Sequence, residues 1–240
     1  MEYEGIGQNF QQLTKYDRDS MPRRGRIAGQ SSQKRNRVPL REFAPPPPLT
    51  TGGLPLWDAI QRRRSIRSYS KKPLALAHLV QLLWATQGIT SPSQGYRSAP
   101  SAGALYPSET YLVVNQIEGL EAGLYHYEPA NAALRLLGKG NLGSQLARAA
   151  LGQPMMEEAG VVFAWTAVIA RNARKYAERA YRYIYLDTGH IAQNLYLAAT
   201  ALGLGCCAAA AFFDDEINNL LDVDGQEETV IYLASVGNPR

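Results

Sequence analysis

The most restrictive feature of this 240-residue sequence is an apolar run, 161–170, in which apolar and polar side chains hardly alternate. Its valine, tryptophan and phenylalanine residues favour the β conformation. A strand that faces water on one side alternates, whereas a strand covered on both sides reads as a continuous apolar run. We therefore expect a central strand with other structure packed against both faces of its sheet.

Two segments show the three-to-four-residue periodicity of amphipathic helices. They are 74–87 and 187–202, and a glycine follows each of them, as is common at helix ends. Shorter helices are expected at 55–63 and 141–151. The alanines of the segment 187–202 indicate close packing against another helix.

Further β-prone runs suggest more strands in the same sheet. They lie at 111–116 and 229–236, and a pair at 123–127 and 133–137 flanks a Glu-Pro-Ala-Asn turn. The pair predicts a hairpin. Because helices and strands are mixed without a regular βαβ alternation, the sequence favours an α+β fold over a doubly wound one.

The N-terminal part of the chain differs from the rest. Residues 17–53 are basic, poor in large apolar side chains, and contain four consecutive prolines at 45–48. Consecutive prolines favour polyproline II and exclude a helix or a central strand. We divide the chain into an arm and linker, 1–53, and a compact domain, 54–240.

The net charge of +4 comes largely from this arm, which is basic over 23–41. The basic stretch lacks aromatic residues for base stacking, so it indicates a solvated arm more than a nucleic-acid-binding segment. The chain has neither a run of about 18 apolar residues nor a secretory signal, so we expect a cytoplasmic protein and no membrane partner.

Several familiar sites have no support in the sequence. It contains no glycine-rich dinucleotide fingerprint, no P-loop and no Gly-x-Ser-x-Gly elbow. Cys206 and Cys207 are adjacent, which strains a mutual disulfide, and they read as small buried thiols. The three histidines are scattered, so no metal site is expected.

Three segments carry candidate chemistry, and each also has a plain structural interpretation. Arg63, Arg64, Ser65 and Arg67 follow a predicted helix and suit anion binding, although basic residues also complement a helix end. The small residues of 97–109 let backbone approach a flat ligand, or simply form a rigid loop. Lys175 and Tyr176 suit proton transfer, or belong to an exposed helix face with Glu178 and Arg182 paired.

Taken in order, these segments resemble the nitroreductase superfamily, and most closely its SagB-type dehydrogenase branch, which includes azoline dehydrogenases of thiazole- and oxazole-forming peptide pathways. Thr14-Lys15-Tyr16 is also typical of that branch. The resemblance covers 54–240 well and the arm weakly. The motifs that carry it are 63–69, Ser101 to Pro107, Asp187 to Leu195, and Leu202 to Gly205 leading to Ala211-Phe212.

The resemblance implies a central, mostly antiparallel sheet flanked by helices, in an intertwined homodimer with FMN at the subunit interface. The flavin contacts that it implies fall into three groups. Arg63, Arg64, Ser65 and Arg67, together with Arg240, are expected at the phosphate, the ribityl chain and the pyrimidine edge. Ser101, Ala102, Gly103, Ala104 and Leu105 are expected beside the flavin from the partner subunit, and Ala210, Ala211 and Phe212 near N5.

The sequence departs from the family pattern at three of these positions. Ala104 stands where many relatives have asparagine, and Ala210 where an acidic residue is usual near N5. The chain provides only Arg240 as the basic residue near the C-terminus that helps to bind phosphate in the family. At Ala104, a backbone contact would replace the side-chain contact to the flavin pyrimidine.

The function that follows is FMN-dependent hydride transfer at flavin N5, with Lys175 and Tyr176 matching a pair associated with azoline oxidation. Dehydrogenation of an azoline in a peptide or small molecule is one option. NAD(P)H-driven reduction of nitro or quinone compounds is another, and a flavin-binding scaffold subunit of a peptide-modifying complex is a third. The sequence leaves the substrate and the direction of electron flow open.

Overall fold

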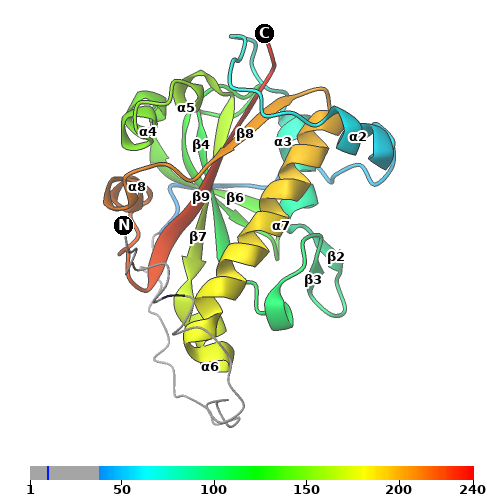
Figure 1. Ribbon diagram of the computed structural model, residues 1–240. Coiled ribbons are helices and arrows are strands. Elements are labelled where there is room, and N and C mark those ends of the chain that lie inside the picture. Colours follow the sequence, from blue (N-terminus) through cyan, green and yellow to red (C-terminus); the bar gives the residue numbers. More distant parts are fainter. Residues whose placement is uncertain (1–9, 11–37) are drawn as a thin grey trace, which may run out of the picture.

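The computed structural model describes residue 10 and residues 38–240 of the chain. The Thr14-Lys15-Tyr16 motif and the basic stretch up to residue 37 lie outside the described residues, so the expectations attached to them stay predictions. Within the described part, helices alternate irregularly along the chain with the strands of one large sheet (Figure 1).

The sheet has seven strands in the order β1-β6-β5-β4-β7-β9-β8, and every neighbouring pair is antiparallel. A separate two-stranded ribbon pairs β2 (Ile89–Ser91) with β3 (Tyr96–Arg97). The mostly antiparallel sheet expected from the sequence is therefore confirmed. The seven strands are β1 (Arg41–Phe43), β4 (Ser108–Val114), β5 (Gly123–Glu128), β6 (Ala133–Lys139), β7 (Val161–Val168), β8 (Gly205–Ala209) and β9 (Glu228–Gly237).

Strand β7 is buried over its whole length, as its unbroken apolar sequence predicts. Phe163 and Trp165 point into one core, where α3 (Leu76–Gln87) and α7 (Ala180–Ala201) pack on the sheet. Val162 and Ala164 point into a second core on the other face. That face is covered by α4 (Gly143–Ala149), α5 (Met155–Glu158) and α8 (Asp214–Leu221).

Helix α7 is the longest helix of the described chain and crosses one face of the sheet (Figure 1). It begins seven residues before the predicted start, because the tyrosine-rich segment before Asp187 is also helical. The chain before it forms α6 (Ile169–Tyr176) and the short 3-10 turn η2 (Ala177–Arg179). The predicted strand 161–170 accordingly ends at Val168, where α6 begins.

The remaining predictions hold in outline, with shifted ends. Helix α2 (Leu56–Arg62) follows Pro55, and β5 and β6 form the expected hairpin. Helix α4 is shorter than its predicted range, and the Asn141 side chain accepts a hydrogen bond from the Gly143 backbone N–H at 2.8 Å. None of the helices in the described part of the chain combines the length and apolarity needed to cross a membrane.

The four prolines lie outside helices and strands and form part of a segment that we call the proline strap, residues 44–49. At one end, β1 pairs with β6. At the other end, the Gln81 side-chain amide bonds both the N–H and the C=O of Leu49, at 3.0 and 2.9 Å. The strap is thus tethered at both ends to the domain, and the division at residue 53 stays a prediction.

Candidate functional site

The basic segment after α2 lies against β8 and α7. The backbone of Ser65 forms an isolated parallel β-bridge with Cys206 of β8, and the Ile66 N–H donates to the Cys206 carbonyl at 2.9 Å. The Ser65 hydroxyl lies 3.1 Å from the Tyr196 hydroxyl of α7, which also accepts the Ala208 N–H at 2.8 Å. Burial raises the pKa of Tyr196, so it stays a neutral phenol. These contacts bring Ser65 and the end of β8 together.

The predicted arginines of this segment differ in their surroundings. The Arg63 guanidinium lies over the Tyr196 ring, 5.2 Å from its centroid. Arg64 donates to the carbonyls of Gln61 and Arg63, so it has the helix-end role that the sequence left open as an alternative. Arg67 is exposed, while the intervening Ile66 packs against the second core.

Arg240 returns to the end of the same basic segment. Its Nε donates to the Tyr69 carbonyl at 2.8 Å, and its guanidinium pairs with Glu158 at 3.1 Å. The Tyr69 ring is buried and its hydroxyl donates to the Ile66 carbonyl, which fixes the turn that carries Arg67. The C-terminal arginine and the motif 63–69 therefore lie side by side, although Glu158 competes for the positive charge.

The predicted segment after β8, residues 210–212, begins with two small side chains that are exposed. Ala210 and Ala211 are exposed, and Phe212 is half-buried against the second core. The Gln153 side-chain amide donates to the Ala211 carbonyl at 2.9 Å, which holds the segment in place. A flat ligand can approach its backbone closely because no large side chain projects from the two alanines.

The loop of small residues is organised by Asp187 of α7. The Ser101 hydroxyl and the Ala102 N–H both donate to its carboxylate, at 2.7 and 3.1 Å. Burial raises the pKa of Asp187, while these two hydrogen bonds act in the opposite direction. Gly103 and Ala104 have φ of +64° and +53° and are exposed at the tip of the turn.

Lys175 and Tyr176, at the end of α6, meet this loop. A Cβ built on Gly103 would lie 2.5 Å from the Tyr176 hydroxyl and 2.6 Å from the Lys175 Nζ. Both polar ends thus converge on the one loop position that has no side chain. Helix α6 ends at Tyr176, where Ala177 adopts φ +46°, so Lys175 and Tyr176 do not share one continuous helix with Glu178 and Arg182.

A buried ion pair, which the sequence did not indicate, ties α6 to the same loop. Arg171 pairs with Glu109 of β4, and it also donates to the Tyr106 carbonyl at 3.1 Å. The other Glu109 oxygen lies 2.7 Å from Nε2 of His126. The sequence carried no such signal, because Glu109 lies between a serine and a threonine and before the predicted strand 111–116.

The two groups of candidate residues meet α7 at different points. The loop contacts Asp187 and the basic segment contacts Tyr196, nine residues further along. At 1.5 Å per residue this separates them by about 13 Å along the helix axis. One chain therefore presents two separate groups of candidate residues.

The two cysteines lie in β8 as free, buried thiols, and burial raises the pKa of Cys206. Arg63 acts in the opposite direction on that pKa, as a weaker effect. Across residue 10 and residues 38–240, no cluster of three or more histidine, cysteine or acidic side chains is arranged to hold a metal ion.

Known proteins resemble this chain in sequence and in fold. The sequence profile described as Nitroreductase family matches residues 60–238. MJ1384 of Methanocaldococcus jannaschii, which is named as a nitroreductase, is 39% identical over 182 residues, covering 76% of this chain and 90% of the relative. The microcin B17-processing protein McbC of Escherichia coli is 28% identical over 160 residues, covering 64% of this chain and 58% of McbC.

A crystal structure from Anabaena variabilis, also named as a nitroreductase, superimposes with a TM-score of 0.68 at 34% identity. The match covers 77% of this chain but only 38% of that longer one. The profile spans most of the domain, including the basic segment, the loop, α7 and β8. The chain belongs to the nitroreductase family.

Proposed function

We propose that this protein is an FMN-dependent oxidoreductase in which Lys175 and Tyr176 handle the proton of the reaction. The observation that carries the proposal is the convergence of the Lys175 Nζ and the Tyr176 hydroxyl beside Gly103. A member of an oxidoreductase family that places an amine and a phenol at one accessible backbone position has the groups needed for acid–base work.

The residues of the chain fit FMN in shape and charge. A flat ring system needs a surface without large side chains, and the exposed Gly103, Ala104, Ala210 and Ala211 offer one. A phosphate needs guanidinium and hydroxyl donors, and Arg63, Ser65 and Arg67, together with the neighbouring Arg240, are of this type. Bound FMN would supply a two-electron acceptor at N5 of its ring.

We further propose that the site is completed in a homodimer. The family resemblance supports this arrangement, because it implies that the loop beside the flavin comes from the partner subunit. Within one chain the basic segment and the glycine loop contact α7 about 13 Å apart. A second subunit would bring its loop 101–105 to the basic segment of the first. Its Lys175 and Tyr176 would then face the same flavin, because they accompany that loop.

Within this site each side chain has a stated task. Lys175 takes the proton that leaves the substrate, or gives one in the reverse direction. The Tyr176 hydroxyl hydrogen-bonds the substrate atom that loses or gains this proton and so orients it. Gly103 leaves room for both groups. Asp187 holds the loop beside Lys175 and Tyr176 by accepting hydrogen bonds from Ser101 and Ala102. The Arg171–Glu109 pair holds α6 against the loop.

For the substrate, we favour an azoline or a related ring in a peptide or small molecule, dehydrogenated with loss of a proton and a hydride. The similarity to McbC, which is named for microcin processing, supports a peptide substrate and partners in peptide modification. A nitro or quinone reductase driven by NAD(P)H is the second candidate, supported by the naming of MJ1384. A flavin-binding scaffold is the third. The cytoplasmic location expected from the sequence stays a prediction.

Visible absorption of the purified protein tests the cofactor, and variants then test the catalytic pair. We expect bound FMN in Lys175→Met and Tyr176→Phe, with turnover of an azoline peptide reduced about 100-fold or more. Lys71→Met, at an exposed lysine away from the loop, is the matched control. Full azoline turnover in both pair variants would overturn the catalytic role of Lys175 and Tyr176. No azoline turnover by the wild type would leave the scaffold or reductase options, and rapid reduction by NADH or NADPH would favour the reductase. Absence of bound FMN would overturn the proposal.

A further inference from the structure

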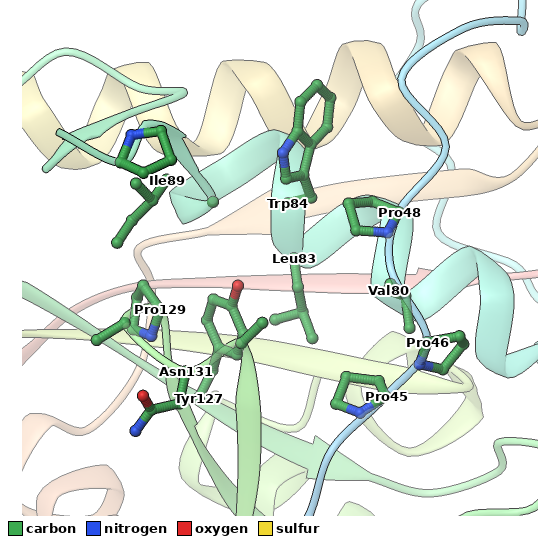
Figure 2. A pocket seen from close by; sticks show the side chains of 14 residues that line it. Pro45, Pro46, Pro48, Val80, Leu83, Trp84, Ile89, Tyr127, Pro129 and Asn131 are labelled. Atoms are coloured by element: carbon green, nitrogen blue, oxygen red, sulfur yellow. The ribbon is translucent and has the colours of Figure 1, made fainter.

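A cavity of about 500 Å³ lies between α3, the β5–β6 turn and the proline strap (Figure 2). None of the residues assigned to FMN or to proton transfer lines it. Its size is that of pockets that hold small organic ligands. The lining is dominated by apolar side chains and rings, and no charged side chain is among the described residues that line it. An occupant of this cavity should therefore be neutral and largely apolar.

The proline strap forms one rigid wall of the cavity. Pro45, Pro46 and Pro48 face Val80 and Trp84 of α3 across it (Figure 2). Because the strap is fixed by β1 at one end and by Gln81 at the other, it cannot swing away as a loose linker would. Prolines also resist collapse into the space, since their φ angles are locked. The cavity is thus held open by covalent stiffness and two anchors.

One polar group inside the cavity has no partner. Tyr127 of β5 is 3% exposed, and its hydroxyl makes no hydrogen bond within the described chain. Figure 2 shows the ring rising from the sheet with the hydroxyl pointing toward Leu83 and Trp84. Burial raises the pKa of Tyr127, so the hydroxyl keeps its proton as a donor. A hydroxyl that faces a cavity without a partner in the described chain is available to hydrogen-bond a ligand or water there.

We propose that this cavity is a second ligand site, separate from the flavin site, for a neutral flat aromatic molecule carrying one hydrogen-bonding oxygen. The ring lies between Trp84 and the proline strap, and the oxygen bonds the Tyr127 hydroxyl. The inference does not depend on the proposed function, because it uses none of the residues assigned to FMN or to proton transfer.

Titration of the full-length protein, with excess FMN present, followed by 19F NMR, tests the proposal with two probes. These are 6-fluoro-2-naphthol and 2-fluoronaphthalene, which differ by the hydroxyl. We expect both to bind, and Tyr127→Phe to weaken the naphthol about fivefold while leaving the hydrocarbon unchanged. Tyr125→Phe is the matched control, because the Tyr125 hydroxyl already donates to the Glu121 carbonyl at 2.7 Å and does not line the cavity.

A filling variant keeps the test decisive if Tyr127→Phe folds poorly. Ala130 lines the cavity from the β5–β6 turn, and Ala130→Trp should abolish binding of both probes. Gln81→Ala, which frees one end of the strap, should weaken both probes equally. Absence of binding to the wild type, displacement of the probes by FMN, or equal losses for the two probes in Tyr127→Phe would each overturn the proposal.

Discussion

Gly103 shows how the absence of one side chain can position two others. Its φ of +64° is strained for alanine, and a Cβ there would displace the ends of Lys175 and Tyr176. We expect Gly103→Ala to cost about 1 kcal/mol of stability. Turnover should fall roughly 100-fold with FMN retained, as for a 1 Å misplacement. Gly95→Ala, with φ +70° and nothing within 4 Å, should lose similar stability and no turnover. Equal turnover in the two variants, measured with the same substrate, would contradict the expectation.

Asp187 makes a prediction about pH. Burial raises the pKa of Asp187 above the ordinary 3.8. The Asp187 carboxyl therefore keeps its proton to a higher pH in the folded protein than in the unfolded chain. Its contribution to stability is then complete below pH 3.8 and is lost as pH rises through the folded-state pKa. Asp187→Asn removes the ionisable carboxyl, so the variant does not lose this stability as pH rises. Thermal unfolding from about pH 4 to pH 7 should therefore show the variant gaining stability relative to the wild type as pH rises. A constant difference would mean that the pKa is not raised.

Arg171 ties helix α6 to the loop through Glu109 and the Tyr106 carbonyl. Removing Arg171 leaves the buried Glu109 carboxylate with His126 but without its cationic partner from α6, which is costly. We expect Arg171→Met to lower the free energy of unfolding by about 2–3 kcal/mol, and to reduce turnover while FMN stays bound. Arg174→Met, at an exposed arginine of the same helix, should change neither. Denaturant unfolding measures the first effect, and equal stability of the two variants would show that the pair does not hold α6.

The elements that the sequence predicted and those it missed differ in what determines them. Strand β7 follows from an unbroken apolar run, and helices α3 and α7 follow from apolar periodicity within the segment itself. Strand β8 consists of glycine, cysteine and alanine, which have little β-propensity, and its conformation comes from pairing with β9. The end of α6 falls beside Ala177, although alanine is the strongest helix former. Contacts with the loop and α7 override local preference there.

The same distinction applies to the candidate site as a whole. The resemblance indicated the basic segment, the glycine loop and the lysine–tyrosine pair, because each is a contiguous motif. It did not indicate Tyr196 or Glu109, because their partners come from distant parts of the chain. Side chains that connect motifs across a sheet leave no local pattern in one sequence.

At the scale of the whole molecule, exposed apolar residues support assembly. Leu56, Trp57 and Ile60 project from α2, with Trp57 77% exposed, and Leu186 of α7 is 59% exposed. Helices α2 and α7 pack together, and exposed apolar surface of this kind marks interaction sites. The proposed two-subunit flavin site requires a partner on this side, because α2 leads directly into the basic segment.

We therefore expect the wild type to be a dimer by light scattering, and the double variant Trp57→Glu, Leu186→Glu to be a monomer. The monomer should also lose FMN, because it lacks the partner's loop, although it keeps the arginines that we propose bind the phosphate. Leu40→Glu, an exposed apolar position beside the edge strand β1, should stay dimeric with FMN bound. A monomeric double variant that retained one FMN per chain would show that a single subunit encloses the flavin, and the two-subunit arrangement would then be wrong.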